Sequence, residues 1–107
     1  MPPISSQRYK LILTYDISPD VQDSYFQFML GELVPAIQSQ GLHMNGAWHT
    51  AYGHYPKRLV EFIADDQEAV EALLDTPLWD DMEQRLRGFV TNYAKKVVRL
   101  RDDQFQF

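Results

Sequence analysis

Histidine is the side chain best suited to acid–base chemistry near neutral pH, and this chain has three of them. His43 and His49 lie six residues apart in an expected strand, which places them on the same face. Six residues of strand span about 20 Å, so the two side chains cannot bind one metal ion together. His54 lies near an expected turn, and the chain has no cysteine, so we expect no metal site. His49 stands among small residues in mid-strand and is a candidate general acid or base. The alternative is a hydrogen-bonded histidine at a sheet or dimer surface.

Two carboxylates, Asp16 and Glu61, are expected on adjacent strands and on the sheet face opposite the helices. Facing carboxylates raise each other's pKa and can hold a proton, which makes Asp16 a second candidate for catalysis. The alternative is an ion pair across the same face, for which the available bases are Lys10, Lys95 and Arg99.

Four aromatic side chains are candidates for lining a ligand site: Tyr15, Trp48, Tyr52 and Trp79. By strand parity, Trp48 and Tyr52 share a face with Met44. If Trp48 lines a cleft against the first helix, it offers a flat apolar wall to an aromatic or acyl ligand. We expect such a cleft, with a volume of roughly a few hundred cubic ångströms. The alternative is that these rings pack in the core or in an interface.

The elements that must position these residues follow from hydrophobic periodicity. Alternation predicts strands at 9–17, 42–55, 58–64 and 92–101. Three- and four-residue spacing predicts a helix from Ser18, kinked at Pro35 and ended by Gly41 in a left-handed conformation. A second helix begins at Asp65 and is broken and restarted at Thr76, which caps the restarted part. Trp79 is expected to anchor that part to the core.

The resulting order, β-α-β-β-α-β, predicts an α+β fold, the ferredoxin-like plait: a four-stranded antiparallel sheet with two helices on one face. We expect one domain over residues 9–107, preceded by a flexible arm at 1–8. The open sheet face is expected to carry Ile12, Leu59, Ile63 and Val97, which is more apolar than a solvated face. A second copy, packed sheet to sheet about a two-fold axis, would cover it and bury more than about 1,000 Å².

Three segments resemble the dimeric α+β barrel proteins, in particular the NIPSNAP-like and antibiotic-biosynthesis-monooxygenase-like branches. They are LVPAIQSQG at the end of the first helix, the strand GAWHTAYG, and TPLWDDM at the helix restart. The resemblance implies a homodimer with a cleft in each subunit between sheet and helices. Haem-degrading members use an Asn on the first strand, a Trp, and a His on the second helix. Here Trp79 is the one match, so we expect no haem or other cofactor.

Charge and hydropathy narrow the choice of partner. The 107 residues carry a net charge of -5, with a pI of about 5.0, which disfavours nucleic acid and anionic membranes. No apolar run approaches the roughly 20 residues of a membrane helix, and the N-terminus lacks a signal-peptide pattern. We therefore expect a cytoplasmic protein.

Three functions fit these observations. The first is a homodimeric small-molecule-binding protein with one small apolar or aromatic cleft per subunit and no chemistry of its own. The second is a cofactor-independent monooxygenase or isomerase acting on an aromatic or polyketide-like substrate, with His49 as proton acceptor and the rings of Tyr15, Trp48 and Trp79 holding it. The third is a structural dimer that serves as a scaffold. We rank the binding protein first, because no acid–base pair stands out.

Overall fold

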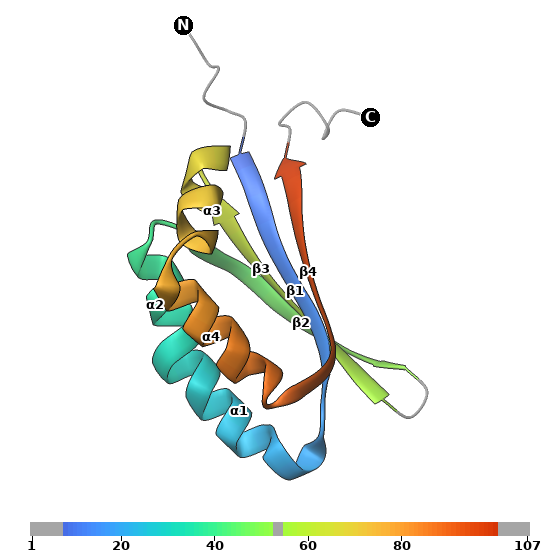
Figure 1. Cartoon of the computed structure of the whole chain (residues 1–107). Helices are drawn as coiled ribbons and strands as arrows, with labels where there is room; N and C mark the ends of the chain where they lie inside the picture. Colours follow the sequence, from blue (N-terminus) through green and yellow to red (C-terminus); the bar gives the residue numbers. More distant parts are fainter. Residues whose placement is uncertain (1–7, 53–54, 101–107) are drawn as a thin grey trace, which may run out of the picture.

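The computed structural model describes residues 8–52 and 55–100, with the side chains of 50–56 outside the description. Four antiparallel strands form one sheet in the order β2-β3-β1-β4. All the helices lie on one face of it (Figure 1), which is the expected ferredoxin-like arrangement. The strands are β1 (Arg8–Ile17), β2 (His43–Tyr52), β3 (Tyr55–Ala64) and β4 (Val90–Leu100). The helices are α1 (Gln22–Phe28), α2 (Val34–Ser39), α3 (Gln67–Leu74) and α4 (Pro77–Arg87). The predicted arm lies outside the described residues, except for Arg8, which begins β1.

The core lies between the helices and the sheet. Leu11, Leu13 and Tyr15 alternate along β1 and are fully buried. Leu11 lies opposite Phe62, and Leu13 lies opposite Val60, in β3. Residues directly opposite each other point to the same face, so this register brings the apolar sides of both strands under the helices. The predicted inward face of β1 is confirmed.

The first helix is irregular next to Pro35, where the sequence predicted a kink. A 3₁₀ turn (Pro19–Val21) leads into α1, and a π turn (Met29–Leu33) joins α1 to α2. Pro35 has no N–H to donate to residue 31, and its ring crowds that carbonyl. The wider π turn directly before it moves the backbone outward, and Val34 donates to the carbonyl of Met29. Gly41 then ends the helix at a φ of 97°, as predicted.

The second helix is split in two at the predicted point. Asp66, one residue after the predicted start, caps α3 by accepting from the N–H of Ala69 at 2.9 Å. The Thr76 hydroxyl caps α4 by accepting from the N–H of Trp79 at 3.0 Å. The buried residues of α4 are Trp79, Met82 and Leu86. Trp79 therefore anchors α4 to the core, as expected.

A bulge in β2 changes which residues share a face. The pairing with β3 shifts between Met44 and Gly46, so Asn45 is an extra residue. Met44 lies opposite the core residue Phe62, whereas Trp48 lies opposite Leu59 on the open face. The prediction that Met44 and Trp48 share a face is therefore wrong. By the same shift His43 and His49 lie on opposite faces.

A second irregularity, between β1 and β4, lies near Asn92, whose φ is 55°. Lys95 lies opposite Leu13 and Val97 lies opposite Leu11, so both belong to the helix-covered face. The expectation that Val97 lies on the open face is therefore wrong.

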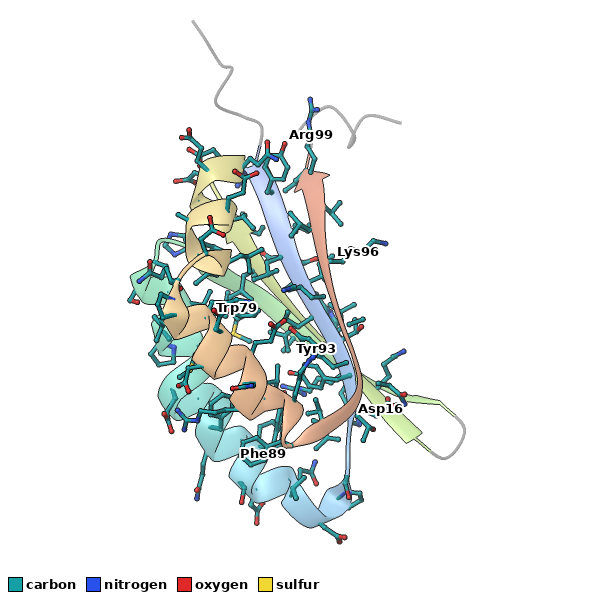
Figure 2. All side chains as sticks on the ribbon, viewed as in Figure 1. Asp16, Trp79, Phe89, Tyr93, Lys96 and Arg99 are labelled. Carbon is teal, nitrogen blue, oxygen red and sulfur yellow. The ribbon has the colours of Figure 1, made fainter. Side chains whose placement is uncertain are left out.

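The open face of the sheet carries the other predicted apolar residues. Ile12, Leu59 and Ile63 are half-buried there, and Val98 joins them opposite Lys10. Lys96 of the same face is directed away from the helices (Figure 2). Within the described ranges, none of the helices has the length and apolarity to span a membrane.

Candidate functional site

One row of residues crosses three strands of the helix-covered face and brings two predicted candidates together. His49 of β2 lies opposite Arg58 of β3, and Arg58 lies opposite Tyr15 of β1. Residues in such a row point to the same side, with Cβ atoms of neighbours about 5 Å apart. His49 is exposed, Arg58 half-buried and Tyr15 fully buried, so the row runs from the edge of the sheet into the core.

Sequence reasoning missed Arg58. A signal for it exists in the chain: Arg58 has the same strand parity as Val60 and Phe62, which are core residues. An arginine that alternates in register with buried apolar residues has its aliphatic carbons covered and its guanidinium near buried groups. That pattern distinguishes it from an ordinary surface arginine.

A hydrogen-bonded cluster joins Arg58 to two buried phenols. The hydroxyls of Tyr15 and Tyr25 lie 2.5 Å apart, and the Nε of Arg58 donates to the Tyr25 hydroxyl at 3.1 Å. The guanidinium carbon lies 5.2 Å from the ring centre of Phe26 and 6.0 Å from that of Tyr25. The two tyrosine rings meet edge to face at 5.7 Å. Residue 58 is therefore held by a hydrogen bond and by cation–π contacts at once.

Burial keeps both phenols of this cluster protonated. It raises the pKa of Tyr15 far above its usual range, and the neighbouring Tyr25 raises it further. Burial also raises the pKa of Tyr25, although the hydrogen bond with Tyr15 and the charge of Arg58 oppose the rise. Both hydroxyls are thus neutral hydrogen-bond donors at physiological pH.

The cluster continues toward α4 through Tyr93. The rings of Tyr93 and Tyr15 stack at 6.5 Å, and the Tyr93 hydroxyl donates to Glu83 at 2.7 Å. Lys95 forms an ion pair with Glu83 at 3.1 Å. Burial would raise the pKa of Glu83, but the hydrogen bonds from Tyr93 and Lys95 outweigh it and lower that pKa. This carboxylate is therefore ionised and neutralises Lys95.

Trp79 is a core residue and does not line an open cleft. Only 1% of it is exposed, and the ammonium nitrogen of Lys95 lies 5.5 Å from its ring centre. Its Nε1–H has no hydrogen-bond partner in the described part of the chain. An unpaired buried donor costs about 1–3 kcal/mol, so the ring stabilises α4 through apolar burial and the contact with Lys95, and not through a hydrogen bond of its N–H.

Trp48 lies on the opposite face from the first helix, and the predicted cleft wall is therefore wrong. Its side chain is 49% exposed and covers Gly46, where an added Cβ would come within 2.7 Å of the ring. The physical reason is the bulge at Asn45, which shifts every later residue of β2 by one position. Tyr52, the other predicted aromatic of this strand, has its side chain outside the described residues.

The two candidate carboxylates share the open face but do not face each other. Asp16 lies four positions along β1 from the residue opposite Glu61, about 13 Å away. Asp16 accepts from Asn92 at 2.7 Å. Glu61 is only 6% exposed, pairs with Lys10 at 2.8 Å and accepts from Asn45 at 2.6 Å. The ion-pair alternative with Lys10 is thus the observed one for Glu61.

The described residues form neither a metal site nor an aromatic cleft. No group of three His, Asp or Glu side chains there is arranged to hold a metal ion. A hollow of about 300 Å³ on α4 is lined by polar side chains, so it is unlike the aromatic cleft expected. Its lining residues are Asp80, Glu83, Gln84 and Arg87.

Comparisons with known proteins find likeness in structure only. No family model matches the chain, and no curated protein matches it significantly. A NIPSNAP family protein from Agrobacterium tumefaciens str. C58 is 13% identical, with a TM-score of 0.66 over 95% of this chain and 93% of that chain. A second one from that organism, of unknown function, is 16% identical, with a TM-score of 0.64 over 92% of each chain.

A NIPSNAP domain protein from Burkholderia xenovorans is 17% identical, with a TM-score of 0.62 over 84% of this chain and 91% of that chain. At such identities the likeness concerns the fold. The chain has the ferredoxin-like α+β fold of the NIPSNAP-domain proteins, as its sequence indicated.

Proposed function

We propose that this protein is a homodimer that binds a small aromatic molecule at the Arg58 end of the helix-covered sheet face. The main support is Arg58, a half-buried residue whose guanidinium lies against the rings of Tyr25 and Phe26 and donates to a buried phenol. Ligand sites combine apolar and aromatic walls with a few fixed polar groups. The exposed His49 of the same row marks the side from which a ligand would enter.

A purely structural role accounts poorly for this cluster. Apolar side chains of similar volume stabilise a core at least as well as buried polar networks do, because polar groups must be desolvated. Here two phenol hydroxyls lie in a core that is otherwise filled by residues such as Leu13 and Val60, and the half-buried Arg58 donates to one of them. The free-energy cost of desolvating these polar groups favours a binding role for the cluster.

The dimer in this proposal forms through the open face of the sheet. Its half-buried residues Ile12, Leu59, Ile63 and Val98 form an apolar surface. Glu61 on this surface is already neutralised by Lys10, so covering that pair leaves neither of the two charges unpaired. A second copy fits best, because a two-fold axis places the same apolar surface against itself.

Sedimentation tests the dimer. The wild-type chain is expected to sediment as a dimer at micromolar concentration. Leu59→Glu places a charge in the interface and is expected to give a folded monomer. Leu30→Glu is the matched control, because Leu30 lies in the π turn of the helix layer and is 69% exposed. A monomeric wild type, or equal dissociation in both variants, would contradict the dimer.

NMR titration with 2-naphthamide, an uncharged aromatic probe, tests the ligand site. We expect saturable shifts of the backbone amides of His49, Arg58 and Phe26. Phe26→Ala is expected to weaken this binding about tenfold, because the ring contact is lost, whereas Leu30→Ala is expected to leave it unchanged. If neither this probe nor its carboxylate analogue produces saturable shifts at these amides, the proposed function is wrong.

A further inference from the structure

We infer that the molecule bound at this site carries a carboxylate, which the terminal amino groups of Arg58 bind. The inference rests on the proposed function and adds the chemical class of the ligand. It follows from three observations on the described residues: the count of hydrogen-bond donors in the cluster, its net charge, and the edge of the guanidinium that Tyr25 does not occupy.

The cluster has more donors than it uses. Arg58 donates its Nε–H to the Tyr25 oxygen, and one of the two tyrosine hydroxyls donates to the other. Whichever hydroxyl donates, the hydrogen of the other has no acceptor within the cluster. The N–H groups at the two ends of the guanidinium add further donors, and none of these three side chains offers an anionic acceptor. The cluster therefore lacks an acceptor oxygen.

The charge count leads to the same conclusion. Three other basic residues have carboxylate partners, in the pairs Lys10–Glu61, Lys95–Glu83 and Arg85–Glu32. Arg58 forms no ion pair with a carboxylate within residues 8–52 and 55–100, although it is half-buried. The neighbouring segment 50–56 contains no Asp or Glu that could supply one. A half-buried charge of this kind is stabilised by an anionic ligand.

The orientation of Arg58 selects a carboxylate among anions. Its Nε edge is occupied by Tyr25, which leaves the edge formed by the two terminal amino groups. Two parallel N–H groups on that edge match the two oxygens of a carboxylate. Because the guanidinium plane lies near the rings of Tyr25 and Phe26, an aromatic group attached to the carboxylate reaches the same rings.

The test compares 2-naphthoate with 2-naphthamide, which share a ring system and differ in charge. Wild-type protein is expected to bind 2-naphthoate at least about tenfold more tightly, because hydrogen bonds to a charged acceptor are the stronger ones. Arg58→Gln is expected to bring that ratio close to one. Arg99→Gln removes the same charge from an exposed position of β4 and is expected to keep it.

The outcomes separate this inference from the proposed function. Saturable binding of both compounds with equal affinity overturns the carboxylate but keeps the site, whereas binding of neither overturns the site. If Arg58→Gln does not fold, the Nε–H resonance of Arg58 in the wild-type protein tests whether the carboxylate binds this side chain. A shift produced by 2-naphthoate and not by 2-naphthamide supports the inference, and the absence of such a shift overturns it.

Discussion

Replacing Tyr25 with phenylalanine removes one hydroxyl and keeps the ring. That hydroxyl accepts from Arg58 at 3.1 Å and shares a hydrogen bond with Tyr15 at 2.5 Å. The substitution therefore leaves the Nε–H of Arg58 and the hydroxyl of Tyr15 without this partner. The aromatic contacts with Tyr15 and Phe26 stay in place, so the change reports on the hydrogen bonds of the cluster.

The expected loss of stability follows from the burial of the two groups that lose their hydrogen-bond partner. Tyr15 is fully buried, so its hydroxyl cannot turn to water, and an unsatisfied buried hydroxyl costs about 1–3 kcal/mol. Arg58 is only half-buried, so water can replace part of its lost bond, and we add no more than about 1 kcal/mol. The free energy of unfolding should thus fall by about 2–4 kcal/mol. The companion substitution Tyr15→Phe leaves the Arg58–Tyr25 bond intact and should cost about 1–2 kcal/mol.

Urea denaturation followed by circular dichroism measures both losses and the double variant. Once Tyr15 is phenylalanine, Tyr25→Phe should cost about 1 kcal/mol less than in the wild type, because the bond between the hydroxyls is already gone. A loss below about 1 kcal/mol for Tyr25→Phe, or one no larger than for Tyr15→Phe, would refute the reasoning.

Three further predictions concern the core and the open face. Trp79→Ala should lower the free energy of unfolding by about 3–5 kcal/mol in urea denaturation, and a loss under about 1 kcal/mol would contradict its role as an anchor. Gly46→Ala should displace the ring of Trp48, because the new Cβ would lie 2.7 Å from it; an unchanged indole N–H resonance of Trp48 would contradict this. Burial raises the pKa of Glu61, but the hydrogen bonds from Lys10 and Asn45 outweigh it, so the folded pKa lies below the usual 4.5. The stability that Glu61 contributes is therefore present above pH 4.5 and lost as the pH falls through the folded pKa. Glu61→Gln should make unfolding less sensitive to acid in that range, and an unaltered acid dependence would count against the ion pair.

Local signals in the sequence were sufficient for the fold and for most helix ends, although the start of α3 was predicted one residue early, at Asp65. Leu11, Leu13 and Tyr15 recur with period two beside polar neighbours, so the inward face of β1 was predictable. Thr76 before Pro77 and Gly41 after the first helix are capping residues whose preference depends on nearby backbone alone.

The candidate site could be predicted only in part. The sequence singled out Tyr15 and His49, and the register places both in the row of Arg58. It did not single out Tyr25, whose helical spacing is that of an ordinary core residue. The bond between Tyr25 and Arg58 joins positions 33 residues apart. No pattern within a short window of sequence reports such a contact.

The sequence by itself determined the order of elements, the inward face of β1 and the caps, because each depends on residues within a few positions of one another. The tertiary structure alone decided the faces of β2 and β4, both of which are edge strands. Asn45 forms a bulge whose side chain donates to Glu61, 16 residues away, and this extra residue reverses the parity of Trp48. In β4 both alternating sets mix apolar and basic residues, so hydrophobicity favours neither face. The contacts of Lys95 with Glu83 and Trp79 decide it, since they exist only once α4 is packed on the sheet.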